Sequence, residues 1–245
     1  MRKIIWFLAL TVSVMTVGAT ASFANAPAEQ LNLVSNEKLV EQTIAARLLS
    51  DIYLKSNLVL KNTPLPPSRA TLSTLNGTSD GEVARINSYA KKNPTLIQVT
   101  PSYYYLTTVA FSKSDITIQT KEDLKKYTIG AIRGVAHSDA ITEGLSNVVY
   151  VNNARTLFLL LKSGRFDIAI DTGANGKYLL AEMKLDEIHA VGELARLELF
   201  NILSPNKKHL AERISKTIRK LKSTGELDAL TKRYEQEFLQ SGVKP

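Results

Sequence analysis

The amino-acid sequence predicts an α/β protein in which mostly parallel sheets are layered with helices. The main observation is an alternation along the chain: short apolar runs typical of strands are separated by stretches with apolar residues at helical spacing. The second observation is the composition. The 245 residues are 44% hydrophobic and 22% charged, as in an ordinary globular protein. Collagen-like, coiled-coil and largely disordered chains are therefore excluded, and the chain is long enough to bury a core.

Turn and capping residues delimit the elements in the first half of the chain. A Pro-rich turn at 64–67 precedes a helix that Gly77 closes, since glycine often follows a helix C-terminus. Thr120 begins another helix, because Asp123 places an acid in its first turn. The elements expected here are strands at 31–34, 58–60, 96–99 and 107–111, and helices at 39–52, around 72–75 and from 120.

The remaining elements are predicted in the same way. Ser204 is an N-cap and Pro205 suits the first helical position, so a helix starts there and ends before Gly225. The strand at 166–171 is apolar nearly throughout, which indicates burial on both faces. The other elements expected are strands at 127–132 and 148–151, and helices from about 138, at 154–163 and at 227–238.

Two extended crossings, near 107–112 and 197–204, are expected to divide the chain into two lobes. The first lobe is then discontinuous and contains residues 25–108 and 200–245. The second lobe contains residues 109–199.

Residues 1–24 have the three-part layout of a secretory signal peptide. Arg2 and Lys3 form a basic start, residues 4–17 are apolar, and small residues follow. The apolar part is shorter than the roughly 20 residues of a membrane-spanning helix. Cleavage is expected after Ala24 or Ala21, and the alternative is an uncleaved membrane anchor. We therefore expect an exported, periplasmic protein, since no later segment is apolar enough to span a bilayer.

The distribution of charge and the absence of Cys argue against a nucleic-acid partner, a disulfide and a metal centre. The chain has a net charge of +8, which becomes +6 without Arg2 and Lys3. Its densest basic group, at 207–222, alternates with apolar residues as on the solvated face of an amphipathic helix. No nucleic-acid partner is therefore expected. With no Cys and three well-separated His residues, neither a disulfide nor a metal centre is expected, and no cofactor is predicted.

Four stretches of the sequence resemble type II periplasmic solute-binding proteins, in particular the family 3 group that includes amino-acid receptors of ABC transporters. They are a helix ending in Gly before a strand that starts with Asp, at 75–82; the first strand and ligand loop of a second lobe, at 127–134; a helix–Gly–strand ending in Asp171, at 161–171; and paired C-terminal helices around a Gly-Glu-Leu turn, at 206–238. Their order and spacing, rather than any single stretch, carry the resemblance.

The resemblance implies a two-lobed type II periplasmic binding protein fold with mixed, mostly parallel sheets and two hinge crossings, which closes on a ligand. It also implies a zwitterionic ligand, held by an Arg at its carboxylate and by an Asp at its ammonium group. The chemistry suits this pairing, because a guanidinium offers a planar fork to a carboxylate and an aspartate accepts hydrogen bonds from an ammonium.

Asp171 and Arg85 are the residues expected to hold the two ends of the ligand. Asp171 ends a buried strand, where open α/β sheets bind ligands; the alternative is a capping role at the next helix. Arg85 lies at a spacing close to that of the family's carboxylate-binding Arg, and Glu82 belongs to the same predicted site. The alternative is a surface ion pair between Arg85 and Glu82. Arg69, at a helix start, is the second candidate for binding the carboxylate of the ligand. The alternative is a solvated residue in the first turn of that helix.

Four further residues are predicted to line the site. Arg133, Val135 and Ser138 lie in a loop before a helix, where backbone N–H groups can bind a carboxylate. Family members usually have a hydroxyl residue in place of Val135, for which Ser138 could compensate. Tyr103 is expected to pack against the ligand, and the alternative is core and hinge packing. His137 is expected to be a loop residue rather than a catalytic base.

The sequence therefore favours a periplasmic solute-binding protein that captures a small polar solute, an amino acid or related zwitterion, for uptake. Its partners would be ABC transporter membrane subunits or a membrane sensor, and we expect a monomer. A non-transport sensor or partner protein on the same fold is the alternative. A hydrolase or dehydratase is less favoured, because the chain lacks a Gly-x-Ser-x-Gly motif, and no catalytic residue is predicted.

Overall fold

The computed structural model describes residues 28–37 and 39–241, and the predicted signal peptide at 1–24 lies outside them. Its strands are β1 (Glu29–Asn36), β2 (Leu58–Leu65), β3 (Gly81–Ile86), β4 (Ile97–Gln98), β5 (Tyr104–Ser112), β6 (Ile129–Ile132), β7 (Val148–Val151), β8 (Ile168–Thr172) and β9 (His189–Leu203). Its helices are α1 (Val40–Lys55), α2 (Pro67–Leu75), α3 (Asn87–Lys92), η1 (Lys121–Lys126), α4 (Ala136–Thr142), α5 (Ala154–Lys162), α6 (Gly173–Met183), η2 (Pro205–Leu210), α7 (Ala211–Ser223) and α8 (Glu226–Ser241). No described helix combines the length and hydrophobicity needed to cross a membrane.

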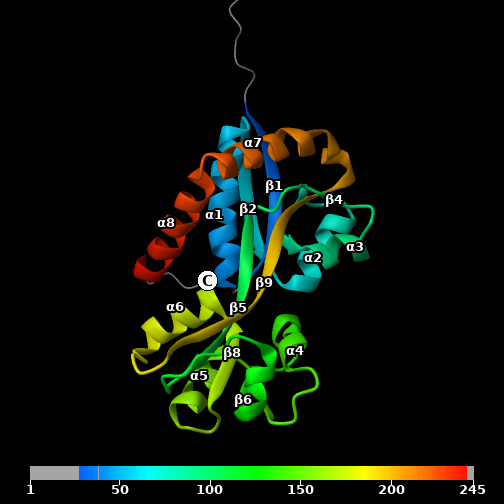
Figure 1. The fold of residues 1–245 in the computed structure, drawn as a ribbon. Helices are drawn as coiled ribbons and strands as arrows, with labels where there is room; N and C mark the ends of the chain where they lie inside the picture. The colour runs from blue at the N-terminus through cyan, green and yellow to red at the C-terminus, as the bar shows by residue number, and fades with distance from the viewer. Residues whose placement is uncertain (1–27, 38, 242–245) are drawn as a thin grey trace, which may run out of the picture.

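The strands form one mixed sheet in the order β2-β1-β3-β9-β5-β8-β6-β7, with β4 also paired to β9. The strand pairs at the two ends of this order are parallel: β1 pairs with β2 and β3, and β6 pairs with β7 and β8. The pairs that involve β5 or β9 are antiparallel. The α/β class and the two-lobed architecture predicted from the sequence are confirmed, as Figure 1 shows.

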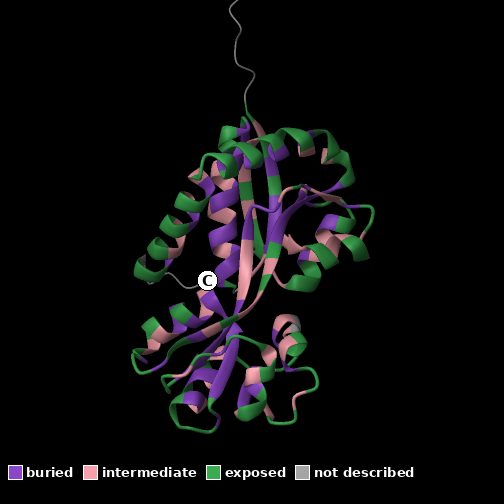
Figure 2. Ribbon diagram, viewed as in Figure 1, coloured by how far each residue is buried: buried purple, intermediate pink, exposed green. Residues whose placement is uncertain are grey.

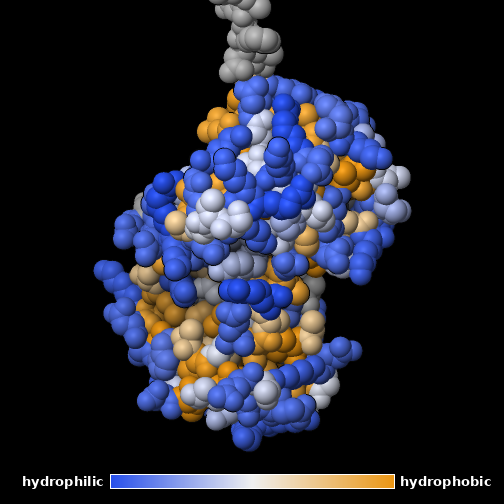
Figure 3. All heavy atoms as spheres, turned by 45° about the horizontal axis from the view of Figure 1, so that its top comes forward, coloured by the Kyte–Doolittle hydropathy of each residue, from blue (hydrophilic) through white to orange (hydrophobic). Residues whose placement is uncertain are grey.

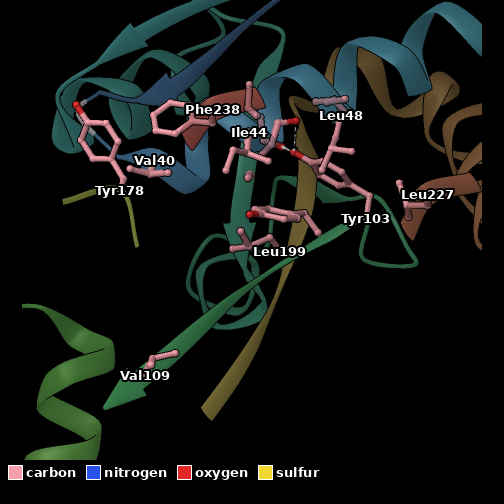
Figure 4. Close-up of a cluster of buried hydrophobic side chains, with 14 of the residues drawn as sticks. Val40, Ile44, Leu48, Tyr103, Val109, Tyr178, Leu199, Leu227 and Phe238 are labelled. Atoms are coloured by element: carbon pink, nitrogen blue, oxygen red, sulfur yellow. Dashed lines mark hydrogen bonds between the residues drawn. The ribbon is translucent and has the colours of Figure 1, made fainter. Parts of the chain in front are cut away.

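In the first lobe, α1 packs against β2 and β3 and contacts α7 and α8. Its residues Ile44, Leu48 and Ile52 recur every four positions and are fully buried, as the helical periodicity predicts. Tyr103 lies in the same cluster, where its hydroxyl donates a hydrogen bond to the carbonyl oxygen of Val83 at 2.9 Å (Figure 4). Figure 2 shows buried residues along α1 and the sheet, and exposed residues on the outer faces of α7 and α8.

In the second lobe, α5 and α6 pack against β8, and α4 packs against β6. The apolar face of α5 buries Leu157, Phe158 and Leu161. The ring of Phe158 meets that of Phe111 edge to face, with 5.4 Å between the ring centroids, a favourable geometry for aromatic pairs. Because Phe111 belongs to β5, this contact ties the core of the second lobe to a strand that also reaches the first lobe.

Two long strands, β5 and β9, connect the lobes, and residues 104–112 of β5 face residues 189–199 of β9. The crossing predicted at 107–112 falls within β5, and the one predicted at 197–204 covers the last part of β9 and one residue beyond it. β9 has 15 residues, although the sequence indicates only its last part as extended. The middle of β9 is partly exposed, and the charged residues Glu193, Arg196 and Glu198 lie there among apolar ones. These charges interrupt the apolar pattern by which a strand is recognised in a sequence.

The helix expected from Thr120 is instead the 3-10 helix η1. The predicted capping pattern is present, since the Asp123 carboxylate accepts hydrogen bonds from the backbone N–H and the hydroxyl of Thr120 at 3.0 and 3.1 Å. The segment is six residues long and buries only Leu124. With so little apolar surface to pack, the cap is not followed by an extended α-helix.

Candidate functional site

A cavity of about 470 Å³ lies between the two lobes on one side of the crossing strands. The first lobe contributes α1 and α8 to its wall, the second lobe contributes α6, and β5 and β9 form its base. It is lined by Val40, Glu41, Ile44, Tyr104, Tyr105, Thr107, Val109, Phe111, Gly173, Ala174, Lys177, Ala190, Gly192, Glu193, Arg196, Lys232, Glu235, Gln236, Phe238 and Leu239. Because both lobes line it, a molecule bound there would contact both of them.

Two buried acids meet where α1 and α6 begin. Glu41, in the first turn of α1, lines the cavity, is 5% exposed, and lies beside Thr172 and Asn175. Its Oε1 atom has no hydrogen-bond partner among the described residues. Asp171, the other acid, is 3% exposed. It pairs across the sheet with Val109, which lines the cavity, and directly opposite residues on neighbouring strands point to the same face.

The surroundings of Asp171 hold its side chain against the start of α6. Its carboxylate accepts hydrogen bonds from the side-chain amide of Asn175 at 2.7 Å and from the backbone N–H of Thr172 at 2.8 Å. Thr172 is also the N-cap of α6, and its hydroxyl oxygen accepts from the backbone N–H of Asn175 at 3.3 Å. The strand end therefore positions the acid and caps the next helix as well.

Burial makes both acids easier to protonate than usual. It raises the pKa of Asp171 to about 7, and the charge of nearby Glu41 contributes to the rise. Burial also raises the pKa of Glu41, with a smaller contribution from Glu235. Neither Glu41 nor Asp171 forms an ion pair with another described residue. The inner end of the cavity is therefore suited to a positively charged group or a strong hydrogen-bond donor.

Cationic and aromatic side chains line the rest of the cavity. The guanidinium of Arg196 lies 3.8 Å from the ring centroid of Tyr105 and pairs with Glu193 at 3.5 Å. Lys177 of α6 and Lys232 of α8 are exposed, and neither pairs with an acid among the described residues. The cavity thus offers acids at its inner end and cations from both lobes, together with an apolar wall.

Arg85 and Glu82 lie together inside the first lobe, away from this cavity. Glu82 is 1% exposed; its carboxylate pairs with Arg85 and accepts from the hydroxyl of Tyr89. Arg85 also donates to the hydroxyl of Thr71 at 3.2 Å, and its guanidinium lies 4.5 Å from the Tyr89 ring centroid. The pair suggested as the alternative from the sequence is present, but it is largely buried rather than on the surface.

The other predicted residues lie in three separate places. Arg69 is exposed in the first turn of α2. Tyr103 is in the core and does not line the cavity. Arg133 is exposed, 5.4 Å from the ring centroid of Tyr150. Asp171 lies behind the cavity wall, close to Glu41, but it does not line the cavity itself, and neither do these three residues.

The loop before α4 reaches the crossing strand from another direction. Val135 is the N-cap of α4, and Ser138 is fully buried with an Oγ atom that has no partner among the described residues. His137 Nδ1 lies 3.3 Å from the hydroxyl of Thr108, and burial lowers the pKa of His137 to about 4. Thr107 and Val109, the neighbours of Thr108, line the cavity. Alternate residues of a strand point to opposite faces, so this loop lies on the other face of β5.

Glu41 is the site residue that sequence reasoning missed, although the sequence carries a signal for it. Val40, Ile44 and Leu48 form the apolar face of α1, and Glu41 falls on that face. A charged residue among buried positions is uncommon unless it is paired or functional. Among the described residues, no group of three or more acids or histidines is arranged to hold a metal ion.

No protein-family model matches the sequence, and no curated protein sequence matches it either. Solved structures are similar in fold. The second substrate-binding domain of GlnP from Lactococcus lactis, in an open conformation, has a TM-score of 0.66 at 18% identity, covering 84% of this chain and 95% of that domain. An amino-acid ABC transporter substrate-binding protein from Streptococcus pneumoniae, bound to L-arginine, has a TM-score of 0.61 at 19% identity, covering 86% and 96%.

A histidine kinase sensor domain with similarity to periplasmic binding proteins is a further neighbour. It has a TM-score of 0.63 at 16% identity and covers 85% of this chain and 96% of that chain. Transport receptors and a sensor domain thus share the arrangement of strands and lobes described above. The chain has the type II periplasmic binding-protein fold.

Proposed function

We propose that this protein binds a small zwitterionic solute, an amino acid or a related amine, between its lobes. The solute's ammonium group contacts Glu41 and Asp171, and its carboxylate contacts Lys177 or Lys232. Its apolar part packs against the aromatic wall of the cavity. Rotation of the lobes about β5 and β9 opens and closes the site, as hinged domains do around their ligands.

The observation that carries this proposal is the pair of buried acids without a cation. A buried carboxylate that lacks a positive partner is costly, and it avoids the cost by taking up a proton. A ligand ammonium group removes the same cost, because it supplies the missing charge at hydrogen-bond distance. A ligand without an amine does not remove the cost of burying Glu41 and Asp171. The site therefore selects for ligands that carry an amine.

The solute is proposed to be received in the periplasm by a monomeric protein without enzymatic activity. The proposed lobes are residues 25–108 with 200–245, and residues 109–199. We further propose delivery to ABC transporter membrane subunits, which is supported by the structural neighbours that are substrate-binding proteins of such transporters. A sensory role, in which the closed form is recognised by a membrane receptor, is the second candidate, because a histidine kinase sensor domain has the same fold.

A thermal-shift series tests the proposal. The purified protein is heated with each of the common amino acids and small primary amines, and with matched alcohols and carboxylic acids that lack the amine. A ligand at 100 times its Kd stabilises the folded state by about 2.7 kcal/mol. We expect stabilisation only by amine-bearing compounds, its loss in Asp171→Asn, and its retention in Asp115→Asn, a control at an exposed acid. Stabilisation by the amine-free analogues alone would contradict the proposal.

A further inference from the structure

One end of the first lobe carries exposed basic side chains, and the chain enters the fold at this same end. β1 starts here at Glu29, whose carboxylate lies 2.8 Å from the amino group of Lys207 in η2. Figure 1 shows α7 lying across this end next to the start of β1.

The basic side chains follow one face of α7 and the turn before it. His209, Arg213, Lys216 and Lys220 are spaced by four, three and four residues, so they lie on one side of the helix. All four are exposed. None of the three Lys and Arg residues in this series forms an ion pair with another described residue. Lys208, also exposed, adds a further charge.

The opposite face of α7 is fixed in the core, so the basic face cannot turn inward. Ile214, Ile218 and Leu221 on that face are at most 2% exposed. The hydroxyl of Ser56, at the end of α1, donates to the hydroxyl of Thr217 at 2.8 Å. This bond ties α7 to the end of α1.

Two apolar side chains are exposed next to this helix. Leu54, in the last turn of α1, is 60% exposed, and Val59, at the start of β2, is 36% exposed. Val59 faces Gln30 in the parallel register of β1 and β2, which places it where the chain enters. In Figure 3, where this end is turned toward the viewer, hydrophobic patches lie among hydrophilic ones.

We propose that this end of the molecule rests on the surface of an anionic lipid bilayer. The basic end is defined as Lys208, Arg213, Lys216 and Lys220 together with Leu54 and Val59. Lys and Arg near an anionic membrane contribute about 1 kcal/mol each, and apolar side chains between them can enter the headgroup region. An acidic protein partner would use the charges alone. The exposed leucine and valine favour the bilayer.

The test compares vesicle binding of the full chain and of two charge-matched variants. The vesicles are phosphatidylcholine alone, or phosphatidylcholine mixed with phosphatidylglycerol. One variant replaces Lys208, Arg213, Lys216 and Lys220 by Gln, and the control replaces Lys91, Lys92, Lys126 and Arg165 by Gln. Both variants lose four positive charges. Residues 4–17 are the same in all the proteins compared, so a difference between them comes from the substituted side chains.

We expect the wild type and the control to prefer the anionic vesicles, and the basic-end variant to lose at least about tenfold of this preference. Added salt should weaken the preference of the wild type, because the charges are exposed. A Leu54→Gln and Val59→Gln variant should lose part of it as well. Equal losses in the two charge variants would show that only net charge matters and would overturn the proposal, as would a wild type without any preference. Solute-induced thermal shifts remain unchanged in the basic-end variant, so this test is separate from that of the solute site.

Discussion

Asp171 is an acid held by the start of α6, with two hydrogen bonds to its carboxylate and another acid beside it. The hydrogen bonds favour the charged form, whereas burial and the charge of Glu41 favour the neutral form. Burial is the larger effect, and the pKa of Asp171 rises to about 7. Near neutral pH the Asp171 carboxyl therefore exists in both its charged and its neutral form. A positively charged ligand would shift it toward the charged form.

The Asp171→Asn variant separates ligand binding from folding. The amide keeps the size of the side chain but cannot carry the negative charge that a ligand ammonium needs. We expect ligand affinity to fall by about 2 kcal/mol or more, roughly thirtyfold in Kd, measured by calorimetry. The ligand-free variant should be at least as stable as the wild type above neutral pH, since it has no buried charge to accommodate. Unchanged affinity would remove Asp171 from the site.

Arg85 contributes to stability rather than to the cavity. Arg85→Ala leaves Glu82 buried without its cation, and we expect the free energy of unfolding to drop by about 3–5 kcal/mol in a urea titration. Adding Glu82→Gln removes the unpaired charge and should recover a large part of this loss. If the single and double variants were equally stable, the ion pair would have no such role.

The position of Asp171 at a strand end could be read from the sequence, whereas the surroundings of Arg85 could not, for a structural reason. An apolar run ending in an acid identifies a strand end from local residues alone. In a regular strand, residues three apart such as Glu82 and Arg85 point to opposite faces. Here β3 shifts its register against β9 between them, and a bulge of this kind reorients a side chain. The shift depends on a partner strand more than a hundred residues later, so the local sequence does not contain it.

At the scale of elements, α6 joins the second lobe to the crossing strand through glycines at its start. A Cβ at Gly173 would lie 2.5 Å from the hydroxyl oxygen of Thr107, and a Cβ at Gly176 would lie 2.2 Å from the ring of Phe111. Both distances are too short for a real contact. The helix therefore lies directly on β5, which keeps Asp171 and the cavity wall in place.

Gly176→Ala tests this contact. In an exposed helix the change would stabilise by about 0.5–1 kcal/mol. Here the added methyl group meets Phe111, and we expect a net destabilisation of about 1–3 kcal/mol in thermal unfolding. The Gly176→Ala and Phe111→Leu double variant relieves the overlap and should be more stable than Gly176→Ala alone. A single variant more stable than the wild type would show that α6 does not lie so close to β5.

The elements themselves differ in how far the sequence defines them. α5 and the end of α7 are predicted closely, because their buried faces have a clear helical period, but the single helix expected from Ser204 is divided into the 3-10 helix η2 and α7. β9 is mostly missed, because its partly exposed middle carries charges on the cavity side. Glu193 and Arg196 line the cavity. The charged residues that make β9 difficult to recognise in the sequence therefore belong to the candidate site.

At the scale of the whole molecule, the buried acids couple stability to pH. The pKa of Asp171 is about 7 in the folded state and near 3.9 in an unfolded chain. Between these values the folded state binds more protons, so the free energy of unfolding falls as pH rises, by up to about 1.4 kcal/mol per pH unit. Burial raises the pKa of Glu41 as well, which acts in the same direction.

We therefore expect the Tm of the ligand-free protein to fall between about pH 5 and about pH 7, as followed by calorimetry. The slope should be smaller in Asp171→Asn, which has one fewer buried acid. A bound amine favours the charged acids, so ligand affinity should rise with pH over the same range. A Tm that rises with pH in both proteins would contradict the effect of burial on these acids.

The most direct measurement of the solute-binding account is mass spectrometry of small molecules released when the purified protein is denatured. Wild type and Asp171→Asn are produced and purified identically, so that both meet the same solutes. The account predicts that a compound with an amine is released from the wild type and is absent or strongly depleted in the variant. The same compound in equal amounts from both proteins, or a retained solute that carries no amine, would contradict it.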